Sequence, residues 1–124
     1  MVRVFIGSAA LLAGFAVATG AFATHALRPH LEARAFEIFE TAARYQMYHA
    51  LALLLVALLL ERTVQVTLLT ASGFAFLFGT LIFSGSLYAL SLSGLKWLGA
   101  VTPLGGAVLL AGWGCLALSA LSYK

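Results

Sequence analysis

Apolar residues occupy four long stretches of the chain, separated by short polar segments. The stretches cover residues 4–24, 45–60, 63–95 and 97–123. About 20 helical residues cross a hydrocarbon layer of about 30 Å, so the first and fourth stretches are long enough as they stand. The second must be extended backwards through Arg44 to Thr41, and the third shortened at its polar opening. The pattern predicts four membrane spans, at about 4–26, 42–61, 66–92 and 97–122.

The spans are predicted to be helices and not strands of a barrel. A lipid-facing strand alternates polar and apolar side chains over about ten residues, and residues 51–60 and 107–118 show no such alternation. Spans joined by short connections run up and down through the membrane. We therefore expect a single all-α domain over residues 1–124, an integral membrane bundle of four transmembrane helices.

The first stretch also has features of a secretory signal peptide. Arg3 precedes it, and Ala21-Phe22-Ala23 has the small-x-small pattern of a cleavage site. The apolar run, however, is about 21 residues long, whereas the core of a signal peptide has about 7–15. We therefore interpret this stretch as a true membrane span.

The connector between the first two spans, from His25 to Arg44, is the most charged part of the chain. Within it, Leu31, Ala35, Phe36 and Phe39 recur at helical spacing beside glutamates and arginines. This pattern is typical of an amphipathic helix that lies at the membrane interface, and we expect a short one here, leading into the second span. A solvated connector with no further role is the alternative.

Composition and charge agree with a membrane protein and exclude other classes. Hydrophobic residues make up 63% of the chain and charged residues 9%, against about 25% charged residues in soluble domains. The net charge of +3 comes from scattered residues with no basic run, so we expect no nucleic-acid partner. The single cysteine, Cys115, excludes a disulfide scaffold.

Small residues predict where the helices pack, because lipid gives no hydrophobic drive for helix association and close backbone approach replaces it. Stripes at a spacing of four lie on spans one, three and four. They comprise Ala10, Gly14 and Ala18; Ala71, Ala75 and Gly79; and Ala107, Ala111, Cys115 and Ser119. The second span has few small residues in 51–60, so we expect it to be peripheral or to contribute large side chains.

Most of the unusual polar residues are expected at one face of the membrane. The end of span one, the start of span two, the end of span three and the start of span four share this face in an up-and-down topology. The expected cluster contains His25, Glu40, Arg44, Tyr45, His49, Ser84, Ser86, Tyr88 and Thr102. Glu40, one helical turn before Arg44, is the expected charge partner of that arginine. The cluster is either a binding site or a structural network of hydrogen bonds.

Several motifs at this face carry a resemblance to a known family. They are Gly20-Ala21-Phe22-Ala23-Thr24-His25, Arg44-Tyr45-Gln46-Met47-Tyr48-His49, Ser84-Gly85-Ser86-Leu87-Tyr88 and Thr102-Pro103-Leu104-Gly105-Gly106. The chain resembles the domain-of-unknown-function family 423, the YgdD-like small inner-membrane proteins, over essentially its whole length. The first block usually reads Gly-Ala-Phe-Gly-Ala-His in that family, so Ala23 and Thr24 depart from it. The resemblance implies a four-span protein of the bacterial inner membrane, and no established reaction.

Three classes of function are compatible with these residues. We expect a non-enzymatic accessory protein that binds membrane lipids, a partner subunit of a membrane complex or a second copy of itself. A small transporter or channel is the alternative, although the four acidic residues all lie at span ends or in the connector. A b-type haem protein with His25 and His49 as axial ligands is the third class. We expect no catalytic residue, no metal ligand and no cofactor, because no acidic metal cluster and no nucleophile beside a positioned base is recognisable.

Overall fold

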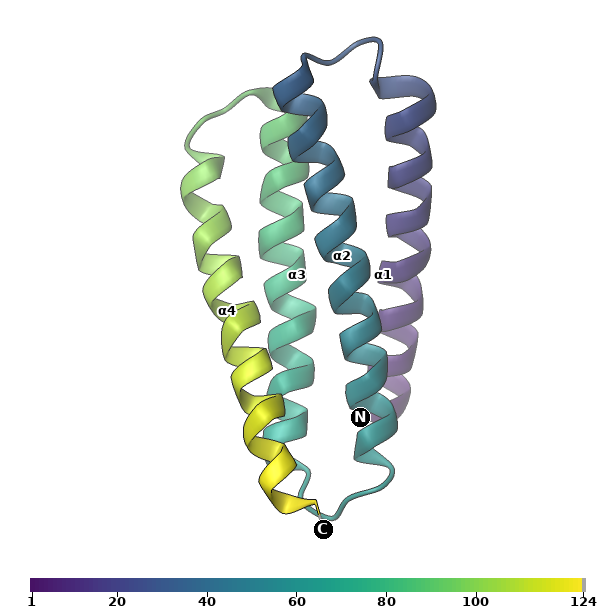
Figure 1. Cartoon of the computed structure of the whole chain (residues 1–124), viewed down its shortest axis with the longest axis vertical. Coiled ribbons are helices and arrows are strands. Elements are labelled where there is room, and N and C mark those ends of the chain that lie inside the picture. Colours follow the sequence, from purple (N-terminus) through teal and green to yellow (C-terminus); the bar gives the residue numbers. More distant parts are fainter. Residues whose placement is uncertain (124) are drawn as a thin grey trace.

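The computed structural model of this chain describes residues 1–123. Four long helices run alternately up and down, and both termini lie at the same end of the molecule (Figure 1). The helices are α1 (Val2–Phe22), α2 (Ala33–Leu60), α3 (Thr67–Ser93) and α4 (Leu98–Ser119). A turn of π-helix, η1 (Ala23–Leu27), prolongs α1, and a short 3-10 segment, η2 (Ala120–Ser122), follows α4. All four are long and apolar enough to cross a membrane, which confirms the predicted all-α fold.

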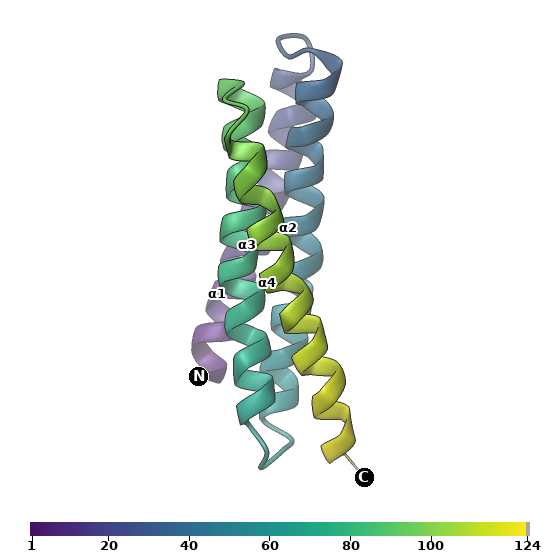
Figure 2. The same cartoon turned by 90° about the vertical axis from the view of Figure 1, so that its left-hand side faces the viewer.

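The helices are arranged in the order of the chain. Each packs mainly against its neighbour in sequence, with α2 and α3 in the centre and α1 and α4 at opposite ends (Figures 1 and 2). In the most apolar 18-residue segment of each helix, half of α2 is buried, against 17% of α1 and 22% of α4. The second span is therefore central and not peripheral, and the alternative expectation, that it contributes large side chains, is confirmed. Alanines such as Ala42, Ala50 and Ala57 allow the close contacts, and Leu53 and Val56 fill the space between them.

The apolar core lies at the end of the bundle that carries the termini. Phe5 is fully buried, and its ring contacts Gly73 so closely that a Cβ on the glycine would overlap it. Leu53, Leu69 and Phe76 complete the same core. This packing joins α1 to α3 as well as to α2.

Glycines bring α3 and α4 close together. A Cβ added to Gly79 would lie 2.8 Å from Cδ2 of Leu109, and one added to Gly105 would lie 2.5 Å from the backbone nitrogen of Phe83. Gly112 faces the ring of Phe76, where an added Cβ would lie 2.9 Å from Cδ1. The close approach predicted at Gly79 is thus confirmed, whereas on α4 Gly105 and Gly112 make it.

The small-residue stripe predicted on α1 lies on an exposed face, and the one predicted on α4 is buried only at its end. Ala10, Gly14 and Ala18 are all exposed on α1, and nothing lies within 4 Å of a Cβ built on Gly14. On α4, Ala107 and Ala111 are exposed, whereas Cys115 is half-buried and Ser119 is buried. A helix that is apolar on every side has no preferred face by hydropathy. A stripe of small residues therefore shows where another helix can approach, and not where one does.

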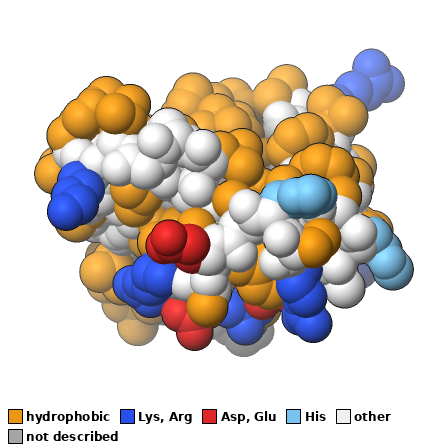
Figure 3. All heavy atoms as spheres, turned by 90° about the horizontal axis from the view of Figure 1, so that it is seen from above, with side chains coloured by type: hydrophobic (Ala, Val, Ile, Leu, Met, Phe, Trp, Pro, Cys, Tyr) orange, Lys and Arg blue, Asp and Glu red, His pale blue; other side chains and the backbone are white. Residues whose placement is uncertain are grey.

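The structure shows no separate interfacial helix between the first two spans, so that prediction is wrong. Pro29 precedes Glu32, the N-cap residue, and α2 then runs unbroken from Ala33 because no glycine or proline interrupts it. Its 28 residues extend about 42 Å, which exceeds a hydrocarbon layer of about 30 Å. Four charged residues of the connector, Arg34, Glu37, Glu40 and Arg44, therefore lie in the first turns of α2. Charged and histidine side chains gather at this end of the molecule (Figure 3).

Candidate functional site

A buried glutamine and a tyrosine connect three helices. Gln46 of α2, 4% exposed, donates from Nε2 to the carbonyl of Leu12 in α1 at 2.8 Å. Tyr88 of α3 donates its hydroxyl to Oε1 of Gln46 at 2.8 Å and also lies 2.9 Å from Oγ1 of Thr19. Polar groups inside a membrane bundle bind one another because lipid offers no partner. This network therefore holds α1 to the central pair of helices.

Serine hydroxyls form hydrogen bonds between α2 and α3 and between α3 and α4. Ser84 donates to the carbonyl of Ala42 at 2.8 Å, and Ser91 donates to that of Ala35 at 2.6 Å, so both join α3 to α2. Between α3 and α4, Ser72 donates to the carbonyl of Gly112 at 2.8 Å. The hydroxyls of Ser86 and Thr102 lie 2.6 Å apart across the same interface. Ser84, Ser86 and Thr102 thus bond neighbouring helices.

His49 is bonded through both of its ring nitrogens. The indole of Trp113, which can only donate, bonds Nε2 of the imidazole at 3.1 Å. Nε2 is therefore the acceptor, and Nδ1 carries the proton that it donates to the carbonyl of Tyr45 at 2.7 Å. His49 is neutral in this arrangement and joins α2 to α4. Axial ligation of a haem would require the bond to Trp113 to break.

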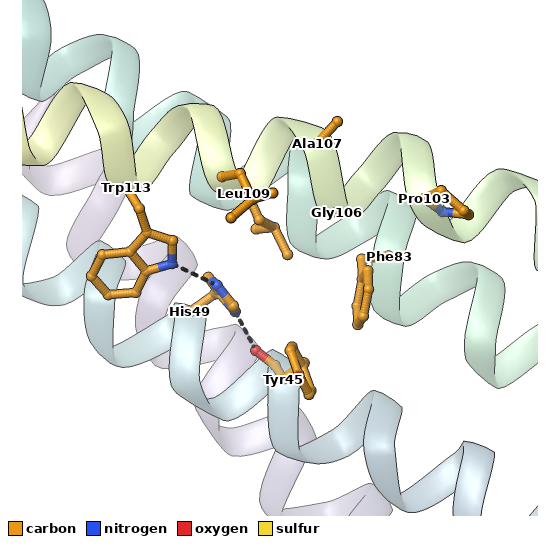
Figure 4. A pocket seen from close by; sticks show the side chains of 9 residues that line it. Tyr45, His49, Phe83, Pro103, Gly106, Ala107, Leu109 and Trp113 are labelled. Carbon is orange, nitrogen blue, oxygen red and sulfur yellow. Dashed lines mark hydrogen bonds between the residues drawn. The ribbon is translucent and has the colours of Figure 1, made fainter.

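A groove beside His49 is the candidate binding site. Its volume is about 450 Å³, and helices α2, α3 and α4 all line it. Figure 4 shows Tyr45 and His49 on one side, Phe83 beyond them, and α4 from Pro103 to Trp113 on the other. The walls are almost entirely apolar, and the His49–Trp113 hydrogen bond lies at one end (Figure 4). Tyr45 and Trp113 are each about two-fifths exposed, so the groove opens to the surroundings of the bundle.

Three residues of the predicted cluster, His25, Glu40 and Arg44, make no hydrogen bond to the others in the described part of the chain. His25 is exposed on η1, at the end of α1. Arg44 is exposed on α2 and Glu40 is half-buried one turn earlier. In residues 1–123 the ion pair present is that of Arg34 with Glu37, at 3.2 Å, so the expected pair between Glu40 and Arg44 does not form. An exposed pair at this spacing contributes only about 0.2–0.5 kcal/mol, which is too little to determine the side-chain conformation.

Sequence reasoning missed several residues of these networks. Thr19, Gln46, Ser72, Ser91 and Trp113 all bond across helices. Gln46 carried a usable signal, since an amide inside a span needs a partner. The serines carried none, because a serine can also bond its own helix. Within the described part of the chain, no three histidine, cysteine or acidic side chains are placed to hold a metal ion.

Four apolar helices of membrane-crossing length, held together by internal hydrogen bonds, define a small multi-span α-helical membrane protein. The family model described as "Protein of unknown function (DUF423)" matches residues 19–106. The chain is 42% identical to a UPF0382 membrane protein of Staphylococcus epidermidis over 121 residues, which cover 98% of each chain. The chain therefore belongs to the DUF423/UPF0382 family of membrane proteins, as its motifs predicted.

Two further relatives extend the comparison. The UPF0382 membrane protein YwdK of Bacillus subtilis is 37% identical over 121 residues, 98% of each chain. The UPF0382 inner membrane protein YgdD of Escherichia coli is 40% identical over 116 residues, covering 93% of this chain and 88% of that one. These names confirm the predicted membrane location, and the E. coli relative is named for the inner membrane. No solved structure was found to match the chain.

Proposed function

We propose that this protein is a non-enzymatic accessory protein that binds a membrane lipid in the groove between α2, α3 and α4. The observation that carries the proposal is the groove itself, about 450 Å³ in volume and lined by side chains of three helices. Sites for apolar ligands are typically concave, about 300–1,000 Å³ in volume, and apolar with a few polar groups. In a membrane-spanning chain, a groove that opens sideways meets lipid acyl chains.

The shape of the groove supports an extended apolar occupant. Gly106 has no side chain, which leaves room beside the ring of Phe83, where an added Cβ would lie 3.8 Å from Cδ2 and Cε2. Pro103 and Leu110 continue the apolar wall along the same helix. The exposed aromatic rings of Tyr45 and Trp113 border the opening. An acyl chain lying along α4 would contact all of these side chains.

The polar residues beside the groove support a binding role over a catalytic one. A general base needs a nitrogen or oxygen free to accept a proton from substrate. Both ring nitrogens of His49 are occupied, by Trp113 and by the carbonyl of Tyr45. The hydroxyls of Ser84 and Ser86 likewise bond α2 and α4. These groups are therefore placed to hold the bundle around the groove.

The experiment uses native mass spectrometry of the protein extracted in mild detergent, with dioleoyl phospholipids added. We expect about one lipid per chain to remain bound to the wild type. Gly106→Leu places a side chain in the groove without backbone overlap and should abolish this binding. The matched control is Gly114→Leu on the same helix, where nothing lies within 4 Å of an added Cβ.

Three results would contradict the proposal. Equal lipid retention by Gly106→Leu and Gly114→Leu would place the lipid elsewhere on the surface. A co-extracted protein that leaves with Gly106→Leu, in the absence of bound lipid, would show that a partner subunit occupies the groove. A second copy of the chain in that position would appear as a dimer mass.

A further inference from the structure

A second hollow lies next to the groove on the same side of the bundle. Its volume is about 310 Å³, and Arg34, Glu37, Ile38, Thr41 and Arg44 of α2 line it together with Leu87 of α3. In contrast to the groove, most of these side chains are polar or charged. The hollow lies at the end of α2 where the charged residues of the chain gather (Figure 3).

The hollow and the groove follow one another along the same faces of α2 and α3. On α2, Thr41 lines the hollow and Tyr45 lines the groove, four residues further along. On α3, Leu87 lines the hollow and Phe83 lines the groove, again four residues apart. Residues four apart share a helix face and are separated by slightly more than one turn, about 6 Å along the axis. One elongated molecule can therefore extend from the charged hollow into the apolar groove.

The hollow has an excess of one positive charge. Arg34 and Glu37 neutralise each other through their 3.2 Å ion pair. Arg44, in contrast, makes no hydrogen bond or ion pair with any of residues 1–123. Glu40, one turn earlier on α2, is half-buried and does not line the hollow. The guanidinium of Arg44 is thus available to an external anion.

The depth of Arg44 in the membrane indicates where that anion comes from. Arg44 precedes Leu60, at the opposite end of α2, by 16 residues, or about 24 Å along the helix axis. With a hydrocarbon layer of about 30 Å starting near Glu61, the Cα atom of Arg44 lies just below the lipid headgroups. A charge at this depth is costly without a partner. Phospholipid phosphates lie within reach of the extended side chain and match the two-pronged donor geometry of guanidinium.

We propose that the lipid in the groove is an anionic phospholipid, with its phosphate bound by Arg44 in the hollow and an acyl chain in the groove. This inference rests on the proposed function and adds the headgroup to it. A headgroup of net charge −1 balances the excess charge of the hollow. A zwitterionic headgroup leaves that charge unbalanced, because it brings a cation of its own.

The experiment compares dioleoyl phosphatidylglycerol with dioleoyl phosphatidylcholine, which carry the same acyl chains. Both lipids are added in equal amounts to the protein in detergent, and native mass spectrometry measures the bound ratio. We expect the wild type to prefer phosphatidylglycerol about tenfold. Arg44→Gln should remove the preference and still bind lipid, and Arg44→Lys should retain part of it. The matched control is Arg62→Gln, which removes the same charge from the turn that follows α2 and should leave the ratio unchanged.

The outcomes separate the headgroup proposal from the groove proposal. A wild type that binds both lipids equally, and loses both with Gly106→Leu, overturns the anionic headgroup and leaves the groove standing. A wild type that binds neither lipid overturns the proposed function itself. An equal loss of preference with Arg62→Gln and with Arg44→Gln shows attraction by net charge alone, which overturns the assignment to Arg44.

Discussion

Both outer helices form hydrogen bonds with the central pair, but glycine packing contributes more at α4 than at α1, where Gly73 of α3 accommodates Phe5. At α4, glycines bring the backbone against α3, with Gly105 against Phe83 and Gly112 against Phe76. At α1, the glycines at positions 7, 14 and 20 have nothing within 4 Å of an added Cβ, and Gln46 and Tyr88 provide hydrogen bonds to the helix instead. The balance between close packing and hydrogen bonding therefore differs between the two interfaces. Lipid removes the hydrophobic drive, so helices associate through close packing or through polar bonds.

Gly105→Leu is expected to have the largest effect on this comparison. The added Cβ would lie 2.5 Å from the backbone nitrogen and 2.8 Å from Cα of Phe83, and backbone cannot rotate aside. We expect the free energy of unfolding to fall by about 3 kcal/mol or more. Unfolding in mixed micelles of rising sodium dodecyl sulfate content measures it. The control, Gly114→Leu on the same helix, should change it by less than about 0.5 kcal/mol; comparable losses in both variants would refute glycine packing at α4.

Gln46→Leu is expected to have an intermediate effect on the other interface. It removes the bonds to the Leu12 carbonyl and to the Tyr88 hydroxyl, and bonds of this kind contribute about 0.6 kcal/mol each, up to about 1.7, in membrane bundles. We expect a loss of about 1 kcal/mol in the same unfolding assay.

A double-mutant cycle tests whether Gln46 and Tyr88 act together. Tyr88→Phe removes the bond that Gln46→Leu also removes, so the double variant should lose less stability than the sum of the single losses, by about 0.6 kcal/mol. Strictly additive losses would mean that the two side chains stabilise the bundle independently. Gln65 is an exposed glutamine between α2 and α3 that accepts a hydrogen bond from Ser122 at 3.3 Å, so Gln65→Leu is the control for loss of an exposed glutamine bond.

Gly14→Leu is expected to have the smallest effect. Gly14 is exposed on α1 and faces open space, so the added side chain meets lipid. We expect the free energy of unfolding to change by less than about 0.5 kcal/mol. A loss as large as that of Gly105→Leu, together with a smaller oligomeric mass in detergent, would show that this face of α1 packs against a second chain.

The candidate site was predictable only in outline. His49 and Arg44 stand out in the sequence as ionisable residues in or near a span, and Ser84, Ser86, Tyr88 and Thr102 follow from the up-and-down topology. Which pairs form did not follow. The indole of Trp113 reaches His49 from a residue 64 positions away. Arg44 does not pair with the half-buried Glu40, because an ion pair at this spacing contributes too little to hold an exposed arginine side chain. Such pairings depend on helix rotation, which one-dimensional spacing does not specify.

The sequence by itself determined the class, the number of spans and the family of this protein. Membrane thickness requires about 20 apolar residues per helix, and backbone polar groups in lipid require helices, so hydropathy alone predicts the topology. Tertiary structure decided which face of each helix is buried, that α2 is central, and that its charged first turns belong to a single long helix. The physical reason is that lipid and protein interior are equally apolar. Hydropathy therefore cannot distinguish a face that meets lipid from one that meets another helix.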